Sequence, residues 1–351
     1  MNFYGFYRRK RILITGHTGF KGSWLCSILL ELQSEICGIS LEPKTDPNLF
    51  SQLKLGERIS SHNIIDIRDF KKVKEVFDKF QPEIVFHLAA QPLVINSYEN
   101  PVYTYDVNVM GTVNICECVR LCKSVKSFVN ITTDKVYENI DEENHAYVET
   151  DRLNGYDPYS NSKSCSELVT DSYKKSFFND LKIAVSTCRA GNVIGGGDYS
   201  ENRIIPDCIK AAKHNEVIIL RNPDSIRPYQ HVLEADFFYL NIALQQYNNL
   251  QLSGSYNIGP DKEDIVRTSQ ICDLFCQFWG QGLSWTEEKK SNYHEAKYLK
   301  LDCSLSKSIL NWSPTWAMRE SLQNIVWWEK QNDKITATTS TIIKYFDEIQ
   351  I

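Results

Sequence analysis

The sequence predicts an α/β fold built on a doubly wound parallel sheet. Short apolar segments alternate with segments of helical periodicity over the first 190 residues, and a glycine-rich turn joins the first apolar segment to the first helix. Strands separated by helices of this length pair in parallel through right-handed crossovers. Such a sheet binds its ligands at the carboxyl ends of the strands. The 351 residues suffice for one large domain or two closely packed ones.

Six strands are predicted from short runs rich in β-branched and aromatic residues. In chain order they cover residues 11–15, 36–40, 63–66, 83–88, 127–132 and 183–188. The intervening helices are predicted from apolar residues that recur every three or four positions, at residues 20–32, 70–80, 101–122 and 158–178. Trp24 and Ile28 mark the buried side of the first helix, and Val73 and Phe77 that of the second.

After residue 190 the alternation weakens and the loops lengthen. We therefore expect residues 1–190 to form the main domain, and residues 191–229 and 259–330 to form a smaller, interleaved C-terminal substrate-binding domain. The segment 230–258, with His231-Val-Leu and a helix near 236–247, is expected to return to the main sheet. Residues 331–351 are rich in Thr, Ser and Ile and are expected to be a disordered tail.

Charge and hydropathy exclude several classes of function. The net charge of −5 argues against a nucleic-acid binder, because neutralising phosphates requires a clustered excess of Lys and Arg. No apolar run approaches the roughly 20 residues that span a membrane. Residues 1–10 are aromatic and basic and lack the apolar core of a signal peptide. We expect a cytoplasmic protein that binds neither nucleic acid nor membrane.

The 11 cysteines are an odd number without the spacing of a disulfide framework. Two pairs share a helix face at i, i+4 spacing, Cys118 with Cys122 and Cys272 with Cys276. No second pair of ligands at metal spacing accompanies either one, so we interpret all four as buried helix residues and expect no metal. Reduced thiols fit a cytoplasmic protein.

The turn Gly16-His-Thr-Gly19-Phe-Lys-Gly22 joins the first strand to the first helix. Its spacing, G-x-x-G-x-x-G, differs from the G-x-G-x-x-G of ordinary dinucleotide-binding dehydrogenases. The physical requirements are the same, because glycine permits a tight turn and the helix N-terminus stabilises a pyrophosphate. The turn predicts a Rossmann-type dinucleotide site with contacts from Gly16, Thr18, Gly19, Phe20, Lys21 and Gly22.

The cofactor is expected to be NAD rather than NADP. An acid near the end of the second strand would bind the ribose of NAD, and Glu42 is the nearest one, two residues beyond Ser40. No Arg follows that could receive a 2′-phosphate. Asp66 and Ile67, after the third strand, fit a contact with adenine through a carboxylate and a backbone N–H. The alternative for Asp66 is a loop cap.

A tyrosine and a lysine lie one helical turn apart in Asp157-Pro-Tyr-Ser-Asn-Ser-Lys163. Asp157 is expected to cap a helix that begins at Pro158, which places Tyr159 and Lys163 on one face. A free tyrosine has a pKa of about 10 and is a poor base at neutral pH. A fixed lysine ammonium and an oxidised nicotinamide would favour the phenolate. Tyr159 could then remove a hydroxyl proton while hydride leaves the same carbon for NAD.

These features resemble the extended short-chain dehydrogenase/reductase superfamily over about residues 10–330. The resemblance rests on the glycine turn, His87-Leu-Ala-Ala90, Asn108 and the Tyr159/Lys163 pair. It implies that the first domain binds NAD and the second a nucleotide sugar. It also implies cofactor contacts from Leu88, Ala89, Ala90, Asn108, Tyr159 and Lys163.

The end of the fifth strand, Thr133-Asp134-Lys135, narrows the implied reaction. Sugar-nucleotide 4,6-dehydratases usually have Thr-Asp-Glu at this position, where Thr and Tyr hold the C4 oxygen, Asp protonates the leaving C6 hydroxyl and Glu removes the C5 proton. Epimerases lack the acid pair. This sequence retains the acid as Asp134 and has Lys135 in place of Glu.

Longer segments resemble the CDP-glucose 4,6-dehydratase family. They are Gly16–Trp24, Thr133–Asn139, Gly195–Asp198, Arg203–Asp207, Arg227–Val232 and His294–Asp302. Tyr199 and Tyr229 stand where that family often has Trp. The implied site residues are Thr133, Asp134, Lys135, Tyr159 and Lys163 for catalysis, and Gln91, Asn192, Arg203, Arg227, Gln230 and Asp302 for the substrate.

The resemblance implies an internal redox cycle on CDP-D-glucose. Tyr159 takes the C4 hydroxyl proton as hydride leaves C4, and the C4 ketone acidifies the C5 proton. Asp134 protonates the C6 hydroxyl, which leaves as water, then hydride returns to C6 and a proton goes to C5. The product is CDP-4-keto-6-deoxy-D-glucose, with NAD regenerated. Lys135 either is neutral and removes the C5 proton, or stays charged and stabilises the enolate while another group is the base.

Several assignments have structural alternatives. Asn192 could be a turn residue, and Arg203, Arg227 and Asp302 could each belong to a surface ion pair. His17 and His87 are interpreted as structural rather than as ligands. A guanidinium binds a diphosphate well, which is why the two arginines are candidates.

Other functions compatible with the sequence are a sugar-nucleotide epimerase, the same dehydration on another nucleotide sugar, and a non-catalytic NAD-sensing scaffold. The superfamily also implies a homodimer or higher homo-oligomer that pairs the helices near residues 105–122 and 158–178.

Overall fold

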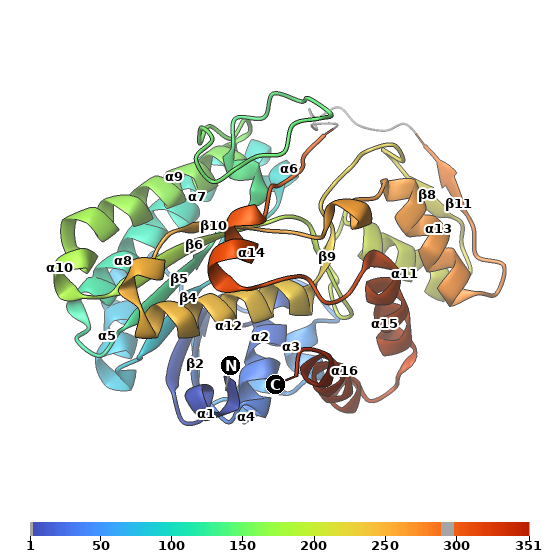
Figure 1. Ribbon diagram of the computed structural model, residues 1–351. Helices are drawn as coiled ribbons and strands as arrows, with labels where there is room; N and C mark the ends of the chain where they lie inside the picture. Colours follow the sequence, from blue (N-terminus) through green and yellow to red (C-terminus); the bar gives the residue numbers. More distant parts are fainter. Residues whose placement is uncertain (1–2, 289–297, 351) are drawn as a thin grey trace.

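In a computed structural model, which describes residues 3–288 and 298–350, the chain forms the predicted α/β fold (Figure 1). Its centre is a seven-stranded sheet in the order β10-β6-β5-β4-β1-β2-β3, with parallel pairing throughout. The strands are β1 (Arg11–Thr15), β2 (Glu35–Ser40), β3 (Ser61–Ile64), β4 (Ile84–His87), β5 (Ser127–Ile131), β6 (Ala184–Ala190) and β10 (Ser255–Ile258).

Helices cover both faces of this sheet, which is why its inner strands are apolar on both sides. Ile12 and Ile14 of β1 pack in one core, with α2 (Phe20–Glu31) and α12 (Val232–Asn248). Leu13 of the same strand faces the opposite core. That second core is covered by α5 (Phe70–Phe80), α8 (Gly111–Leu121) and α9 (Pro158–Tyr173).

Two of the predicted long helices contain a π turn. Residues 101–121 run through α7 (Pro101–Tyr105), the π turn η1 (Asp106–Met110) and α8 without a break. After α9 come the π turn η3 (Lys174–Phe178) and the short α10 (Asn179–Leu181). π turns insert one residue into an α-helix and occur often at functional sites. The first of these two contains Asn108, a predicted site residue.

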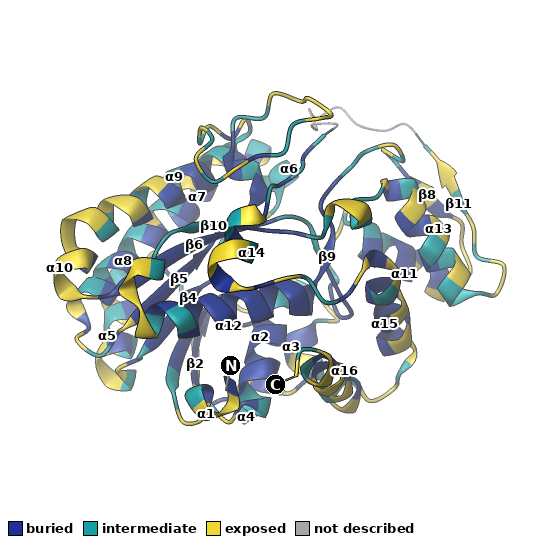
Figure 2. Cartoon of the chain, viewed as in Figure 1, coloured by how far each residue is buried: buried dark blue, intermediate teal, exposed yellow. Residues whose placement is uncertain are grey.

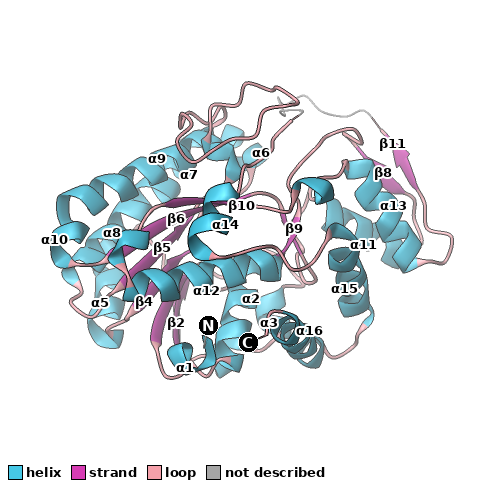
Figure 3. Cartoon of the chain, viewed as in Figure 1, coloured by secondary structure: helices cyan, strands magenta, loops and turns pink. Residues whose placement is uncertain are grey.

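The C-terminal part forms a smaller lobe with its own core, visible beside the main sheet in Figure 3. Its elements are α11 (Ile204–His214), α13 (Thr268–Trp279), α15 (Met318–Lys330) and a two-stranded parallel sheet of β8 (Ile218–Leu220) and β11 (Trp285–Glu287). The remaining elements are α1 (Phe3–Tyr7), α3 (Leu49–Gln52), α4 (Leu55–Arg58), α6 (Val94–Glu99), α14 (Ser304–Leu310), η2 (Asp134–Val136), η4 (Leu250–Leu252) and η5 (Lys262–Asp264).

The segment 230–258 returns to the main domain through α12 and β10, but not through His231. Residues Gln230–His231 form β9, which pairs with β7 (Val193–Ile194) in a separate two-stranded sheet. The expectation that His231-Val-Leu joins the main sheet is therefore wrong, because Val232 already begins α12. β3 also lies two residues earlier than predicted, since its Ser61 and His62 do not form an apolar run.

The prediction of a disordered tail is also wrong. Residues Lys334–Glu348 form α16, which packs on α2 and α15 (Figure 1). Asp333 caps this helix through backbone N–H groups of Ile335 and Thr336. Thr338, Ile342 and Tyr345 give it a buried face at helical spacing. Within residues 3–288 and 298–350, the helices lack the combination of length and apolarity that a membrane crossing requires.

Candidate active site

The glycine turn after β1 has the geometry of a phosphate-binding turn. Gly16 has a φ of +79°, and a Cβ there would lie 2.7 Å from the backbone nitrogen of Ala89. A Cβ on Gly22 would lie 2.3 Å from the carbonyl oxygen of Gly16. Gly19 is different, because its Cβ would meet only that same oxygen, at 3.4 Å. Gly16 and Gly22 are therefore required by the fold, while Gly19 leaves open space at the N-terminus of α2.

Side chains of the same turn connect it to β2 and β3. The Thr18 hydroxyl donates to the carbonyl oxygen of Leu41 at 2.8 Å and also contacts the Ser40 hydroxyl. A hydrogen bond of 2.7 Å joins Nε2 of His17 to Nδ1 of His62. Burial, and next the neighbouring His62, lower the pKa of His17 to about 4. The structural interpretation of His17 fits these contacts, and the turn is held rigid before any ligand binds.

The residues predicted to contact adenine lie at the carboxyl end of β3. Asp66 accepts hydrogen bonds from the backbone and the guanidinium of Arg68, which lower the pKa of the carboxyl. Arg68 also pairs with Asp106, at 2.8 Å. Asp66 thus acts as the loop cap, and its contact with adenine stays a prediction. The side chain of Glu42 is exposed.

The segment after β4 is fixed by buried hydrogen bonds. The backbone N–H of Ala89 and the ring of His87 both bond to the Thr15 hydroxyl, at 3.2 and 2.7 Å. Burial is the main cause that lowers the pKa of His87 to about 3. The backbone N–H of Gln91 donates to Oδ1 of Asn108, whose amide returns a bond to the Gln91 carbonyl. Leu88 to Ala90 therefore run in a preformed loop beside the glycine turn.

Gln91 and Asn108 use their side chains within the protein. Nε2 of Gln91 donates to the Thr104 hydroxyl and to the carbonyl of Leu93. Nδ2 of Asn108 donates to the Ser162 hydroxyl at 2.9 Å as well as to Gln91. Both residues thus position the loop after β4 against α9, and direct contacts with substrate or cofactor stay predictions.

The predicted tyrosine–lysine pair lies on one face of α9, as expected. Asp157 caps the helix by accepting the backbone N–H of Ser160 at 3.0 Å. The Lys163 ammonium group donates to the carbonyl of Ile131 at the end of β5, at 2.9 Å. Burial is the main cause that lowers the pKa of Lys163 to about 7 and raises that of Tyr159 to about 12. A hydrogen bond with Thr133 acts on the Tyr159 pKa in the opposite direction.

Thr133 and Asp134 follow β5 directly and meet the tyrosine there. The Thr133 hydroxyl donates to Oδ1 of Asp134 at 3.0 Å, while Oδ2 of Asp134 is buried without a hydrogen-bond partner. Burial raises the pKa of the Asp134 carboxyl, and the charges of Lys135 and Arg227 oppose that rise. A buried carboxyl of this kind favours the protonated form, which can donate a proton. Lys135 is half-buried beside it.

The predicted substrate residues differ in their burial and in their partners. Arg227 and Gln230 are buried, and Oε1 of Gln230 has no hydrogen-bond partner. The charge of Arg227 acts on the Asp134 carboxyl, and contacts of Arg227 and Gln230 with the substrate stay predictions. Arg203 forms an ion pair with Asp198 at 3.0 Å, yet its charge also acts on Tyr159.

Asn192 and Asp302 contribute differently. The carbonyl oxygen of Asn192 accepts the backbone N–H of Gln230 at 2.9 Å, which fixes the loop after β6. Asp302 accepts the backbone N–H of Ser304, the first residue of α14, at 2.8 Å. Its role toward a ribose stays a prediction. Of the segment 294–302, residues 294–297 lie outside the described residues.

Sequence reasoning missed a buried ion pair behind α9, the helix that contains Tyr159 and Lys163. Arg189 of β6 pairs with Glu167 of α9 at 3.0 Å, and the side chains are only 4% and 2% exposed. Glu167 also accepts the hydroxyls of Thr132 and Thr187, at 2.5 and 2.6 Å. This network holds α9, and with it Tyr159 and Lys163, against the ends of β5 and β6. The position of Glu167, one turn after Lys163, was the available signal.

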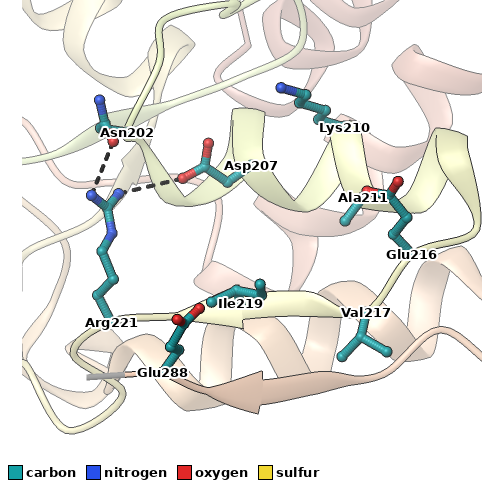
Figure 4. A pocket seen from close by; sticks show the side chains of 9 residues that line it. All are labelled: Asn202, Asp207, Lys210, Ala211, Glu216, Val217, Ile219, Arg221 and Glu288. Carbon is teal, nitrogen blue, oxygen red and sulfur yellow. Dashed lines mark hydrogen bonds and ion pairs between the residues drawn. The ribbon is translucent and has the colours of Figure 1, made fainter. Parts of the chain in front are cut away.

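A separate cavity of about 270 Å³ opens on the C-terminal lobe, between α11 and the β8–β11 pair (Figure 4). Arg221 reaches across it to Asn202, at 2.9 Å, and to Asp207, at 3.6 Å. The residues described as lining it include none of the predicted site residues.

Comparisons with known proteins find a dehydratase at high sequence identity, and both dehydratases and epimerases among the solved structures that share the fold. The sequence matches the GDP-mannose 4,6 dehydratase family over residues 13–325. The CDP-glucose 4,6-dehydratase of Salmonella typhimurium is 46% identical over 331 residues, which cover 93% of this chain and 92% of that protein.

Solved structures with low sequence identity share the fold. The dTDP-glucose 4,6-dehydratase of Bacillus anthracis, in complex with NAD, has a TM-score of 0.76 at 21% identity and covers 93% of this chain and 98% of its own. An epimerase of Methanothermobacter thermautotrophicus has a TM-score of 0.80 at 20% identity, with 98% and 97% covered.

Proposed function

Because the chain belongs to the GDP-mannose 4,6 dehydratase family, we propose that it is an NAD-dependent enzyme that converts CDP-D-glucose to CDP-4-keto-6-deoxy-D-glucose and water. The 46% identity to a CDP-glucose 4,6-dehydratase over nearly the whole of both chains supports this substrate. Relatives named for dTDP-glucose and UDP-glucose are more distant in sequence, at 24–30% identity.

The residues around the glycine turn fit NAD. Gly19 leaves room at the N-terminus of α2, whose backbone N–H groups can bind a pyrophosphate. Gly16, Thr18, Phe20 and Gly22 shape that turn, and the loop Leu88–Ala90 borders it through Thr15. When bound, NAD supplies the acceptor and donor of hydride.

One observation carries the dehydratase assignment. Asp134 presents a buried carboxylate oxygen without a partner, next to Thr133 and within reach of the charge of Arg227. Elimination of the C6 hydroxyl as water needs a general acid. Burial raises the pKa of this carboxyl, so it stays protonated to a higher pH than an exposed aspartic acid does. An epimerase moves no hydroxyl group and has no use for such an acid. Asp134 therefore protonates the leaving hydroxyl.

Tyr159 and Lys163 serve the proton transfer at C4. Tyr159 removes the C4 hydroxyl proton, and the Thr133 hydroxyl holds the C4 oxygen beside it. The Lys163 ammonium group, fixed on the Ile131 carbonyl, favours the tyrosinate. Lys135 is adjacent to Asp134 and either removes the C5 proton or stabilises the enolate.

The smaller lobe provides the sugar-nucleotide contacts in this proposal, and residues 1–190 with 230–258 provide the NAD platform. Gln230 lies in β9 and Arg227 in the loop before it, and the charge of Arg227 acts on Asp134. Arg203, at the N-terminus of α11, adds a second guanidinium for the diphosphate. Two arginines and two helix N-termini supply positive charge locally, although the chain as a whole is acidic.

The test is to incubate the purified enzyme with CDP-, dTDP-, GDP- and UDP-sugars, and to measure product mass and the alkali-dependent absorbance of a 4-keto sugar. We expect CDP-glucose to lose one water. Loss of water from another nucleotide sugar would mean that the substrate carries a different nucleotide base. Turnover without a change in mass would show an epimerase. NAD binding without turnover of any of them would favour the scaffold.

A homodimer is also proposed. Helices α7, α8 and α9 lie together on one side of the molecule (Figure 2). They and the π turn η1 carry exposed apolar residues, including Val102, Met110 and Leu168 at 82%, 50% and 56% exposure. Pairing these helices with those of a second copy would bury this patch in a four-helix contact. Sedimentation of wild type and Leu168→Asp tests this, since the variant should be monomeric.

Localisation in the cytoplasm is the last part of the proposal. All 11 cysteines are free thiols. The sulfur atoms of Cys208 and Cys272 lie 3.5 Å apart and do not form a disulfide. Two thiols this close would oxidise in a secretory compartment, so a reducing compartment suits them. Fractionation of the native cell, with thiol labelling of each fraction, tests this.

A further inference from the structure

The turn after β5 contains the acid assigned to the elimination, and its own hydrogen bonds are weak. Thr133 precedes η2, a single 3₁₀ turn formed by Asp134, Lys135 and Val136. The backbone N–H of Val136 donates to the Thr133 carbonyl at 3.4 Å, and that of Lys135 donates to the Thr133 hydroxyl, also at 3.4 Å. Ordinary N–H···O bonds are shorter, at about 2.7–3.2 Å. The direction of the Asp134 carboxyl therefore depends on what holds the chain on either side of the turn.

The two residues before the turn, Ile131 and Thr132, form its entrance, and α9 fixes both of them. The Lys163 ammonium group donates to the Ile131 carbonyl at 2.9 Å. Glu167, one helical turn later on α9, accepts the Thr132 hydroxyl at 2.5 Å. The entrance is thus held by the same helix that contains Tyr159, the residue assigned to the C4 oxidation.

Val136, at the exit of the turn, is held by α9 as well. The Ser164 hydroxyl donates to the Val136 carbonyl at 2.7 Å, closer than its other acceptor, the Ser160 carbonyl, at 3.1 Å. The backbone N–H of Asn154 donates to the Val136 carbonyl at 3.0 Å. Val136 and Ser164 are both buried. The exit therefore has its own contacts, separate from those of the entrance.

Tyr137, the next residue, adds the strongest of the exit contacts. Its hydroxyl accepts a hydrogen bond from the guanidinium of Arg189 at 3.0 Å and donates to Oδ1 of Asn257 at 2.6 Å. Its ring stacks on Tyr147, with 5.1 Å between the ring centres and 12° between the planes. Because Arg189 is paired with Glu167 of α9, the Tyr137 hydroxyl connects the exit of the turn to the helix that also holds the entrance.

Asn257 of β10 is itself fixed, so it offers the Tyr137 hydroxyl an acceptor that does not move. Its side-chain amide donates to the carbonyls of Tyr147 and Asp302, at 2.8 and 3.0 Å. Its backbone N–H donates to the Glu149 carboxylate at 2.8 Å. Asn257 is completely buried. A buried acceptor that loses its donor is costly, so Asn257 requires a hydroxyl at position 137.

We propose that Tyr137 is a positioning residue for the elimination step, which holds the exit of the turn and thereby sets the direction of the Asp134 carboxyl. The inference rests on the proposed function, because that reaction assigns the elimination to Asp134. The C4 oxidation uses Thr133 and Tyr159, which the entrance contacts hold in place. Loss of the exit contacts should therefore slow the elimination and leave the oxidation intact.

Tyr137→Phe removes the hydroxyl and retains the ring that stacks on Tyr147. The variant loses the donor to Asn257 and one acceptor of Arg189. We expect the elimination to slow about 10- to 100-fold, because a small misplacement of a reacting group has effects of this size. The C4 oxidation should keep its wild-type rate, so NADH absorbance should build up in a single turnover.

Two further variants separate the exit from the entrance. Ser164→Ala removes the other side-chain contact of the exit and should also slow the elimination. It tests the same end of the turn even if Tyr137→Phe fails to fold. Thr132→Val removes the entrance contact with Glu167 and should slow the C4 oxidation itself, so that less NADH appears. Opposite effects on NADH from the two ends of one turn would not arise from a general loss of stability.

The experiment follows NADH absorbance and product mass in single turnovers with CDP-glucose, in the wild type, these three variants and Tyr7→Phe. Tyr7 is a matched control, because it is completely buried and its hydroxyl donates to the Leu240 carbonyl, also at 2.6 Å. It precedes the amino end of β1, whereas the turn follows the carboxyl end of β5. Tyr7→Phe should keep the wild-type rates of both steps. Wild-type elimination in Tyr137→Phe, or an equal loss of oxidation and elimination, would overturn the inference.

A second measurement needs no substrate. Hydrogen–deuterium exchange of the backbone amides of residues 133–139 reports how firmly the turn is held. Exchange should be faster in Tyr137→Phe than in the wild type and unchanged in Tyr7→Phe, and equal exchange in all three would also refute the inference. If the wild type fails to act on CDP-glucose, the proposed function is wrong, while this exchange still decides whether Tyr137 holds the turn.

Discussion

The Thr133 hydroxyl donates to one oxygen of Asp134 at 3.0 Å, and the other oxygen of that carboxyl is buried without a partner. We expect the free oxygen to be the proton donor to the C6 hydroxyl. Asp134→Asn cannot donate this proton, so turnover should fall about 10²–10⁴-fold. C4 oxidation should persist, and NADH absorbance should build up in a single turnover. A variant that forms product at the wild-type rate would contradict the assignment.

Tyr159→Phe should stop the reaction one step earlier. Without the phenol, the C4 hydroxyl proton has no acceptor, so no NADH should appear when substrate is added. We expect a loss of about 10²–10⁴-fold in single-turnover oxidation. NAD binding, measured by calorimetry, should be retained, which distinguishes this variant from one that fails to fold. Rapid NADH formation in Tyr159→Phe would mean that another group is the base.

The role of Lys135 is decided by exchange of the C5 hydrogen. If Lys135 is the C5 base, Lys135→Ala should lose solvent exchange at C5 in deuterated water while C4 oxidation continues, because proton removal follows oxidation. If Lys135 stabilises the enolate, Lys135→Arg should restore exchange, since arginine retains the charge but is not a base. Exchange at the wild-type rate in Lys135→Ala would exclude the base role. NMR of the recovered sugar nucleotide measures this.

Two glycine variants separate folding from cofactor binding. A Cβ on Gly22 would lie 2.3 Å from the Gly16 carbonyl oxygen, so Gly22→Ala should lower the melting temperature of the protein without any ligand. Gly19→Ala meets that oxygen only at 3.4 Å and should fold normally, yet its methyl group fills the space expected for pyrophosphate. We expect its NAD affinity to fall at least about tenfold. Wild-type affinity in Gly19→Ala would place the phosphates elsewhere.

Acid should destabilise the protein through three buried histidines. Burial is the main cause that lowers the pKa of His87 and His231 to about 3 and of His17 to about 4. The unfolded chain takes up protons near pH 6.5, so it binds more protons than the folded chain below that value. Stability is therefore retained above about pH 6.5 and lost as the pH falls toward about 4.

The histidine variant His87→Gln tests the size of this effect. Removing one such group should reduce the slope of unfolding free energy against pH, near pH 5, by about 1.4 kcal/mol per pH unit. Guanidinium unfolding at several pH values measures the slope. His214, which is exposed, is the matched control, and His214→Gln should leave the slope unchanged. An unchanged slope in His87→Gln would show that this histidine titrates normally in the folded protein.

Local sequence patterns were sufficient to predict most strands of the main sheet and the helix that contains Tyr159 and Lys163. β1, α5 and the start of α9 carry strong periodicity or a cap, and they lie where the sequence indicated. α16 was missed because its Thr- and Ile-rich stretch has low helix propensity, and its stability comes from packing on α2. No local pattern shows such a partner.

The candidate site was predictable where one motif holds several residues together. It was not predictable where the contacts join residues that are far apart in the sequence. The Lys21 ammonium group lies 6.0 Å from the ring centre of Tyr239, which is 218 positions later in the chain, and nothing near either residue indicates the other. Glu167 and Arg189 meet for the same reason, through the crossover from α9 to β6. Side-chain direction was equally hidden, since the periodicity of α2 does not reveal that Lys21 extends toward α12.

Because the helix contains the π turn Asp106–Met110, the alignment of its side chains depends more on the number of residues in the helix than on which residues they are. Each α-helical residue advances the direction of the side chains by about 100°. Removing one residue from the turn would rotate Thr112 and Ile115 away from His87 and the second core, while Thr104 stayed in place against Gln91. Substitutions on the outer side of this helix leave that alignment intact. A one-residue deletion or insertion near Asn108 would misalign either the loop after β4 or the helix packing on the sheet, so this segment should accept changes of residue and reject changes of length.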